Sequence, residues 1–243
     1  MKDRLIVRAS WNKDITFRAS NVLKQQEIAK GLHQIVLDVG NSIASGYTKP
    51  GQFVQAKIDD SKPGFFAIAS CPDPNNGAAI ELLVKNQGET AELMCQMREG
   101  SKVDVSDVLG KGFPVEKIPP SEYPIVYIFC TGSGISPIRA VIESGVLEPG
   151  KRKLVKVYYG AKSADFMAYA DEIMDWEKKY GVQVVPVFSM DKNGYVQDVF
   201  FEDGCEMGPG VAAILCGQKE MAEAITETLT SSGVDKDVIL TNF

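Results

Sequence analysis

The chain has 243 residues, of which 44% are hydrophobic and 24% charged, and its formal net charge is -6 at pH 7. This length and apolar content suffice for two domains with hydrophobic cores. The acidic balance argues against nucleic acid as the main partner, because a surface that binds phosphate backbones needs concentrated Lys and Arg. No apolar run approaches the length of a membrane span. We therefore expect a globular protein with two domains and no membrane-spanning segment.

The five cysteines are scattered, odd in number and without C-x-x-C spacing. This pattern is typical of reduced thiols in a reducing compartment, and it argues against an iron–sulfur cluster or a zinc site. We predict no bound metal, and we expect most of these thiols to be small core residues. They are Cys71, Cys95, Cys130, Cys205 and Cys216.

The amino end is basic, in contrast to the rest of the chain. Residues 1–24 contain six Lys or Arg and two Asp, and the tripeptide Arg-Ala-Ser occurs at Arg8 and again at Arg18. The segment lacks a continuous apolar stretch, which argues against a secretory signal. Two interpretations stay open: the remnant of an organelle transit peptide, or an ordinary first strand with basic solvent-facing residues.

From about residue 14 to 113 the apolar segments are short, often alternate with polar residues and are separated by turn residues, as in "HQIVLDV", "GQFVQAKI" and "AIELLVK". This pattern predicts a mainly β domain, either a small barrel or a sandwich. Its single helical signal is "GETAELMCQM", residues 88–97, with Thr90 as the expected cap and Gly100 as the expected stop.

The segment "KIPPSEYP", residues 117–124, predicts a hinge, and we place the two domains at 1–118 and 119–243. After the hinge, predicted strands such as "LVKVYYG" and "VQVVPVF" alternate with helical patterns, including "FMAYADEIMDWEKKY" at 166–180. Such alternation builds a mostly parallel sheet with helices on both faces. Ligands of such sheets bind at the carboxyl ends of the strands.

A glycine-rich turn joins the first of these strands to its helix. Residues 127–130 predict a strand, and residues 137–144 predict a helix that begins with proline and that Gly145 ends. The first N–H groups of a helix have no intrahelical partner and carry the positive end of its dipole, and Gly132 and Gly134 let a ligand approach the main chain. The turn is therefore predicted to be a phosphate cradle, with simple chain reversal as the alternative.

A small β-barrel followed by a nucleotide-binding α/β domain resembles the ferredoxin-NADP reductase superfamily over nearly the whole chain. The points of similarity are "TGSGISPIRA", "YYGAKS", "GYVQD" and "CGQKEM", in the family's order. Within the superfamily the chain is most similar to plastid-targeted plant proteins of the kiwi fruit protein type. It is also similar to electron-transfer subunits of dihydroorotate dehydrogenase, which carry a cysteine-ligated cluster that this chain lacks. The resemblance implies that the nicotinamide cofactor is bound by Thr131, Gly132, Ser133, Gly134, Ser136, Pro137, Gly160, Gly217 and Met221.

The resemblance also implies FAD in the barrel. The family's barrel strand reads Arg-x-Tyr-Ser, and "GFFAIAS" places Gly64, Phe66 and Ala67 at those positions. Gly64 lacks the guanidinium that would hold the flavin pyrophosphate, Phe66 keeps an aromatic face for the isoalloxazine, and Ala67 lacks the hydroxyl that contacts flavin N5. A second anchor is expected at the start of the barrel's helix, beside the unfavourable charge of Glu89. The expected flavin contacts are Phe66, Ala67, Ile68, Gly88 and Thr90.

Two residues are expected at the point of hydride transfer. Cys216 stands where the family places a cysteine, and Phe243 ends the chain where reductases end in a tyrosine stacked on the flavin. Thr241 stands where the family has an acidic residue, so no carboxylate proton relay is expected. The alternatives are a core thiol at a strand end and a terminal ring that only covers the barrel. In an active enzyme, hydride passes from nicotinamide C4 to flavin N5 while the protein supplies positioning.

The residues that select between NADH and NADPH follow the third strand of the sheet. In NADP-using relatives, a Ser-Arg pair and a Lys two residues before a Tyr hold the 2′-phosphate. Asp191 instead adds a negative charge that repels a phosphate and accepts from a free 2′-hydroxyl. Lys162 and Lys192 are the counterargument, although surface lysines are ordinarily solvated. We favour NADH, because the family positions here read Ser189, Met190, Asn193 and Tyr195.

The sequence thus predicts a flavin-dependent NAD(P)H oxidoreductase that passes electrons to an unidentified protein or small acceptor. The alternative is an accessory or regulatory subunit of a larger plastid complex: the lost Arg, Ser and carboxylate favour it, whereas the intact nucleotide motifs favour the enzyme. A third hypothesis is a nucleotide-binding module unrelated to redox chemistry. The resemblance and the basic amino end predict a place in the chloroplast stroma or on chloroplast membranes, and otherwise in the cytoplasm.

Overall fold

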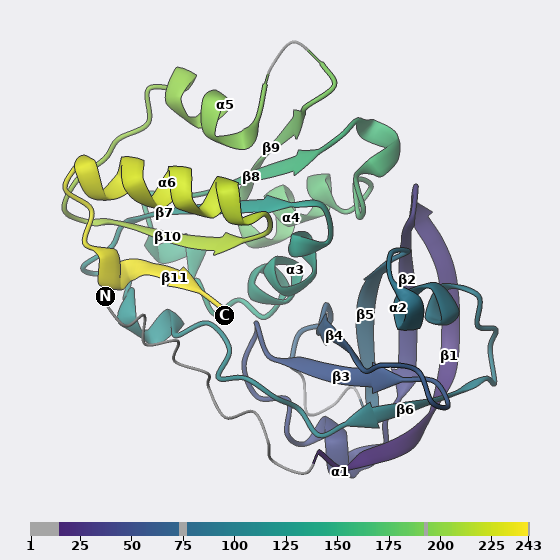
Figure 1. Ribbon diagram of the computed structural model, residues 1–243. Helices are drawn as coiled ribbons and strands as arrows, with labels where there is room; N and C mark the ends of the chain where they lie inside the picture. Colours follow the sequence, from purple (N-terminus) through teal and green to yellow (C-terminus); the bar gives the residue numbers. More distant parts are fainter. Residues whose placement is uncertain (1–14, 73–76, 192–193, 243) are drawn as a thin grey trace, which may run out of the picture.

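The computed structural model describes residues 15–72, 77–191 and 194–242, which form two domains (Figure 1). Phe243 and the basic residues 1–14 lie outside the described residues, so the terminal ring and the plastid location stay predictions. Every helix among the described residues is too short or too polar to cross a bilayer.

The first domain is built on an antiparallel sheet of six strands in the order β4-β3-β6-β1-β2-β5. A bridge between Ile68 and Leu82 joins the end of β4 to β5 and closes the sheet into a barrel. This confirms the predicted antiparallel β-barrel of the first half. The strands are β1 (Phe17–Ala29), β2 (Leu32–Asp38), β3 (Phe53–Lys57), β4 (Gly64–Ala67), β5 (Ala79–Lys85) and β6 (Lys102–Ser106).

Alternation of apolar residues explains the barrel core. In β2, Ile35 and Leu37 point inward and are fully buried, and in β5 the same holds for Leu82 and Val84. Successive side chains of a strand point to opposite faces, so these period-2 positions line one interior. Two short helices accompany the barrel: α1 (Gly40–Ala44), which the sequence pattern did not predict, and α2 (Glu89–Cys95).

The expected capping role of Thr90 is wrong, because Gly88 is the N-cap residue of α2. The Thr90 hydroxyl instead donates to the carbonyl oxygen of Lys62 at 2.6 Å. The side chain of Thr90 is buried, so its hydrogen bond to the distant Lys62 decides its role, and it does not cap the helix.

The second domain has a five-stranded parallel sheet in the order β11-β10-β7-β8-β9, which confirms the predicted α/β half. In Figure 1, α5 and α6 lie over one face of this sheet, and α3 and α4 lie against the other. The strands are β7 (Ile125–Thr131), β8 (Leu154–Ala161), β9 (Gln183–Phe188), β10 (Val211–Cys216) and β11 (Ile239–Thr241). The helices are α3 (Ile135–Glu143), α4 (Ile173–Tyr180), α5 (Val196–Glu202) and α6 (Lys219–Ser231).

Two helix starts differ from the sequence prediction. A 3-10 turn over Gly132–Gly134 runs directly into α3, so Pro137 is the third residue of the helix and not its first. The helix expected from residue 166 begins only at Ile173. Tyr169 has a φ of +58°, which a helix excludes, and its buried hydroxyl donates to the Glu81 carboxylate of the barrel at 2.8 Å. This contact outweighs the helical pattern of the segment.

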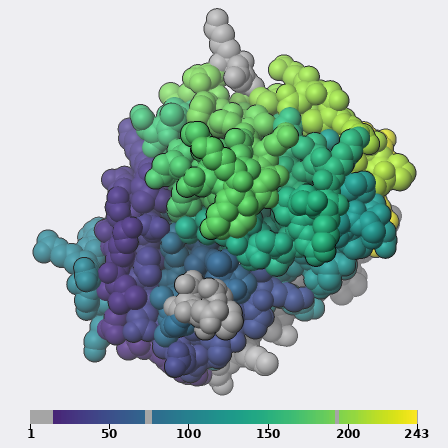
Figure 2. Space-filling view, turned by 180° about the vertical axis from the view of Figure 1, so that it is seen from behind, coloured from purple at the N-terminus to yellow at the C-terminus, as the bar shows by residue number. Residues whose placement is uncertain are grey.

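The two domains share an apolar contact. Leu32 and Leu83 of the barrel, together with Ile118 of the connection, are buried within the same cluster of side chains as the core of the α/β domain. Seen from behind, the purple start of the chain lies against the green part of that domain (Figure 2). A main-chain hydrogen bond also joins the domains, from Lys30 N to Asp165 O at 2.7 Å. The predicted domain boundary after residue 118 lies between β6 and β7 and stays a prediction.

A cluster of charged side chains around Arg139 of α3 also joins the domains. Arg139 lies 2.9 Å from a Glu81 oxygen of β5, 3.0 Å from Glu143 and 2.8 Å from Glu172, and it stacks 4.7 Å from the ring centre of Tyr169. Burial alone would lower the pKa of Arg139, but the three carboxylates raise it above its usual value. Burial raises the pKa of Glu172 despite the neighbouring guanidinium. The guanidinium therefore balances an excess of buried negative charge.

We expect Arg139→Met to lower the free energy of unfolding by about 3 kcal/mol, because it leaves buried carboxylates without their cation. Tyr169→Phe, which removes one hydrogen bond to Glu81, should cost about 1.5 kcal/mol. Burial already raises the pKa of Glu172, and loss of the Arg139 charge should raise that pKa further, so the folded variant binds more protons than the unfolded chain as the pH falls. The Arg139→Met deficit should therefore shrink as the pH falls.

Urea unfolding of both variants and wild type at several pH values measures these differences. A deficit for Arg139→Met that equals that of Tyr169→Phe, or that does not change with pH, would contradict the assigned balance of charge.

Candidate functional site

The residues predicted to bind the nicotinamide cofactor gather at the carboxyl ends of the parallel strands. Thr131 ends β7, Gly160 lies at the end of β8, Ser189 follows β9 and Gly217 follows β10. These ends lie in register at one edge of the sheet, since Cys130 pairs with Cys216, and residues 131 and 160 are also paired. This edge is where ligands of parallel sheets bind.

The two glycines of the turn after β7 have different roles. Gly132 has a φ of +53°, and a Cβ built there would meet nothing within 4 Å, so its main chain is open to a ligand. A Cβ at Gly134 would lie 2.3 Å from the carbonyl oxygen of Cys216. Gly134 therefore permits the close packing of the turn against β10. The sequence predicted that a ligand could approach the main chain at both glycines, and the structure leaves room for this at Gly132.

The turn after β7 and the loop after β10 are tied together. Gln218 N donates to Thr131 Oγ1 at 3.0 Å, and a Cβ at Gly217 would lie 2.3 Å from the same oxygen. The Thr131 hydroxyl therefore fixes the two loops relative to each other. Gly160 serves packing in the same way, because a Cβ there would lie 2.6 Å from a methyl group of Val196.

Several predicted contact residues are buried. Ser136 is 2% exposed and its hydroxyl donates to the carbonyl oxygen of Ala67 on β4 at 3.0 Å, so it bonds the barrel and not a phosphate. Pro137 and Met221 lie within the domain core. The predicted residues that keep solvent access at this edge are Thr131, Gly132, Ser133, Gly134, Ser189, Asp191, Tyr195 and Gly217.

Cys216 is a neutral thiol at the end of β10. It is 9% exposed, and burial raises its pKa to about 12, so it stays protonated at neutral pH. Its partner in register, Cys130, is fully buried and its pKa is also raised by burial. Both thiols therefore behave as small apolar side chains and not as nucleophiles.

The edge beyond β9 presents exposed side chains. Met190 is 74% and Tyr195 60% exposed, and Asp191 is exposed between them in sequence. The ammonium of Lys162 lies 5.4 Å from the ring centre of Phe166, which holds it in a cation–π contact. Lys192 and Asn193 lie outside the described residues. This edge therefore combines exposed apolar side chains with the carboxylate of Asp191. Lys162, the lysine described there, has the ring of Phe166 as its partner.

On the barrel strand β4, the exposed ring is not the expected one. Phe66 is 9% exposed, and its ring lies 2.8 Å from where a Cβ at Gly64 would stand. Phe65 is 65% exposed, and its ring centre lies 5.9 Å from that of Phe53. Ile68 is fully buried and contributes only its main chain to the closing bridge. Sequence reasoning missed Phe65 because the resemblance directed attention to the next ring.

A cavity of about 260 Å³ lies beside β4, lined by residues 62–66 and 87–91. It contains the predicted second anchor, but the groups of that anchor have partners within the chain. Gly88 N donates to Glu92 Oε1 at 3.1 Å, and the Thr90 hydroxyl donates to Lys62 O. Lys62 and Gln87 also line it, and no motif in the sequence had singled them out.

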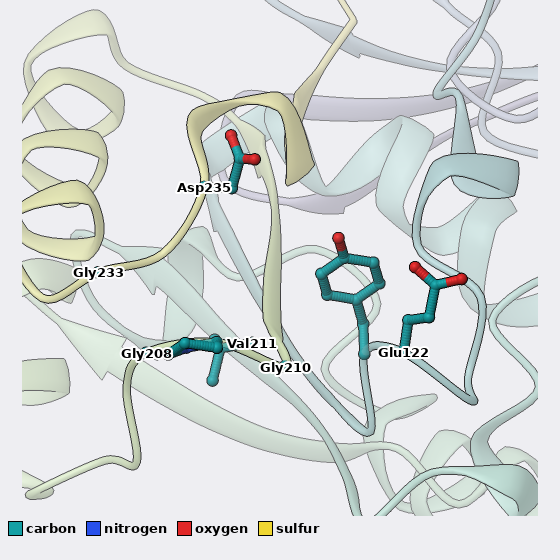
Figure 3. Close-up of a pocket in the computed structure, with 8 residues that line it drawn as sticks. Glu122, Gly208, Gly210, Val211, Gly233 and Asp235 are labelled. Atoms are coloured by element: carbon teal, nitrogen blue, oxygen red, sulfur yellow. The ribbon is translucent and has the colours of Figure 1, made fainter.

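A larger cavity, of about 420 Å³, lies at the opposite edge of the parallel sheet, at the amino ends of β7 and β10. Figure 3 shows its glycine-lined wall and the carboxylates of Glu122 and Asp235. None of the predicted site residues lines it. Parallel sheets bind ligands at the other edge, so this cavity is separate from the candidate site. Within the described ranges, no group of three or more His, Cys, Asp or Glu side chains could hold a metal ion.

Comparison with known proteins identifies the class of this fold and site. The family model described as "Oxidoreductase NAD-binding domain" matches residues 128–227. The chain belongs to the ferredoxin-NADP reductase-like family of FAD/NAD-binding oxidoreductases, whose members transfer electrons. The predicted cofactors, FAD with a pyridine nucleotide, are those of this family.

Among curated proteins, it is 35% identical over 230 residues to the fruit protein pKIWI502 of Actinidia deliciosa, covering 87% of this chain and 72% of that protein. It is 26% identical over 208 residues to the electron transfer subunit of dihydroorotate dehydrogenase B (NAD(+)) of Bacillus velezensis, covering 85% of this chain and 77% of that subunit. A ferredoxin NADP+ reductase of Neisseria gonorrhoeae, solved with bound FAD and NADP, has the same fold. It gives a TM-score of 0.74 at 17% identity, over 89% of this chain and 92% of that one.

We expect Gly132→Asp to weaken binding of NAD+ by at least about tenfold, because a carboxylate then stands where the main chain is open to the pyrophosphate. Gly132→Asn is the matched control: it has the same size, it also tolerates a positive φ, and it carries no charge. Isothermal titration with NAD+ measures both variants. Equal affinities in the two would place the pyrophosphate elsewhere.

Proposed function

We propose that this protein binds FAD on the barrel and NAD(P)H at the carboxyl edge of the parallel sheet, transfers hydride between them, and passes the electrons to a partner protein. The observation that carries this proposal is the hydrogen bond from Ser136 Oγ to Ala67 O. It brings the start of α3, beside the turn expected to hold the nucleotide, into contact with the barrel strand expected to hold the flavin. Cofactors bound to these two elements would meet at the domain junction.

The barrel offers features that fit a flavin dinucleotide. The exposed ring of Phe65 presents a flat apolar face beside the 260 Å³ cavity. A flat ring system stacks on such a face, and the adjoining cavity has room for the polar linker. These features support FAD binding although Gly64 and Ala67 lack the side chains that the resemblance implies.

The nucleotide edge fits a pyrophosphate. The main chain of Gly132 is open, and no acidic residue lies in the first turn of α3 or in the 3-10 turn before it. The positive end of the helix dipole then favours a negatively charged group. The site therefore combines access with a favourable field.

The chain contributes orientation more than acid–base chemistry. Bound flavin supplies the acceptor for the nicotinamide hydride. Cys216 is held protonated by burial, which raises its pKa to about 12, so it serves as a neutral contact. Ala67 offers only main-chain groups at the junction, and its carbonyl already accepts from Ser136. The rate then depends on how the two domains orient the reacting rings.

A partner protein as acceptor is supported by the relatives, which include an electron transfer subunit of dihydroorotate dehydrogenase B and a sulfhydrogenase gamma subunit from Pyrococcus furiosus. The second candidate function is an accessory subunit that retains nucleotide without turnover. The neutral surroundings of Ala67 and Cys216 favour it. Turnover separates the two candidates.

FAD-loaded protein is expected to oxidise NADH with ferricyanide as an artificial acceptor, at a rate proportional to its FAD content. This is measured as loss of the reduced nicotinamide absorption. A preparation that holds FAD and binds NADH but gives no turnover would contradict the enzyme and favour the accessory subunit.

We further propose that NADH is preferred, because Met190 and Asp191 occupy the exposed edge beyond β9 and Lys162 is held against Phe166. The value of kcat/KM for NADH should exceed that for NADPH by about tenfold or more, since a 2′-phosphate would meet the carboxylate of Asp191, which has no ion pair among the residues that the structure describes.

The double variant Met190→Arg, Asp191→Asn should shift the NADPH to NADH ratio of kcat/KM by about tenfold or more toward NADPH. Met174→Arg, Asp175→Asn makes the same change of net charge at two exposed residues of α4, and it serves as the control. A ratio that moves equally in both proteins would assign the effect to net charge and overturn the assigned edge.

A further inference from the structure

The cavity beside β4, which has room for the polar linker of FAD, is lined by a single described cation, Lys62. We propose that the ammonium of Lys62 binds the diphosphate of FAD in this cavity. The inference rests on the proposed FAD-binding function and deepens it by naming the residue that supplies the positive charge. The residues that carry it are Lys62, Gly64, Phe65 and Thr90, with Glu89 as the opposing charge.

Two segments of the chain form the cavity, and buried hydroxyl groups hold them together. The Thr90 hydroxyl donates to Lys62 O at 2.6 Å and lies 2.8 Å from the hydroxyl of Ser61. Thr90 is 4% and Ser61 7% exposed. The main chain of Lys62 is therefore fixed at the rim, while its side chain is exposed and free to reach an occupant.

The charges of the lining residues identify Lys62. Among the described residues that line the cavity, Lys62 alone is positive and Glu89 alone is negative. In the described part of the chain, the Lys62 ammonium takes part in no ion pair. A dianionic linker in this cavity would need at least one cation to offset Glu89 and the loss of water.

The strand itself cannot present a cation here. A side chain at position 64 would begin 2.8 Å from the ring of Phe66, so the packing of β4 requires Gly64. The residue two places earlier, in the turn before the strand, lies at the same cavity. The cation therefore comes from the turn and not from the strand.

The exposed ring of Phe65 indicates that the anion is attached to a flat ring system. Phe65 lines the same cavity as Lys62, and its ring is 65% exposed beside Phe53. A free phosphate would gain nothing from this apolar face. A phosphate-linked aromatic ligand such as FAD uses the ring and the cation together.

FAD and riboflavin are the probes, because riboflavin has the ring system without phosphate. Their dissociation constants are measured by flavin fluorescence for wild type, Lys62→Gln, Lys62→Arg and Lys102→Gln. Lys102 is an exposed lysine of β6 away from the cavity, and it controls for net charge. Thermal unfolding checks that the variants fold.

We expect Lys62→Gln to weaken FAD binding by about tenfold or more, with riboflavin binding unchanged. Lys62→Arg should retain FAD affinity, and Lys102→Gln should match wild type. If wild type binds FAD and Lys62→Gln binds it equally well, the inference is wrong while the proposed function stands. If wild type binds neither flavin, the proposed function fails and the inference fails with it.

Discussion

The ion pair between Arg139 and Glu81 determines how the two domains meet. Arg139 belongs to α3, whose start adjoins the nucleotide turn, and Glu81 belongs to β5 of the barrel. A buried guanidinium with three carboxylates around it is stable only in one arrangement, because any displaced carboxylate would be buried without its cation. The same helix bonds β4 through Ser136. One short helix therefore sets the distance between the two elements proposed to bind the cofactors.

In this arrangement, most of the residues predicted to bind the nucleotide have structural roles. Gly134, Gly160 and Gly217 permit close approach of neighbouring elements, and Ser136 bonds the barrel. Gly132 is the position of the turn where the main chain stays open. The charged groups of this junction are paired with one another around Arg139, and the predicted contact residues Ala67 and Cys216 are neutral. This agrees with chemistry carried by bound cofactors and positioned by the protein.

The domain plan was predictable because strand alternation and the order of turns are local features of the sequence. The position of the candidate site at the carboxyl ends of the parallel strands was predictable for the same reason. A strand that is followed by a glycine turn and a helix places that turn at the carboxyl edge of the sheet. Contacts between distant residues were not predictable. Tyr169 leaves the helical pattern because Glu81 accepts its hydroxyl, and Thr90 bonds Lys62 instead of capping α2. The roles of Phe65 and Lys62 depend on the cavity, which no sequence pattern describes.

The most direct test of the junction as a site of hydride transfer is the visible absorption spectrum of FAD-loaded protein, mixed with NADH in the absence of oxygen. No acceptor is present, so the spectrum reports only the step between the two cofactors. If the two domains bring the nicotinamide and flavin rings together, the flavin absorption band bleaches after NADH is added. A flavin band that persists while NADH is shown to bind would mean that the junction holds both cofactors without bringing them into contact.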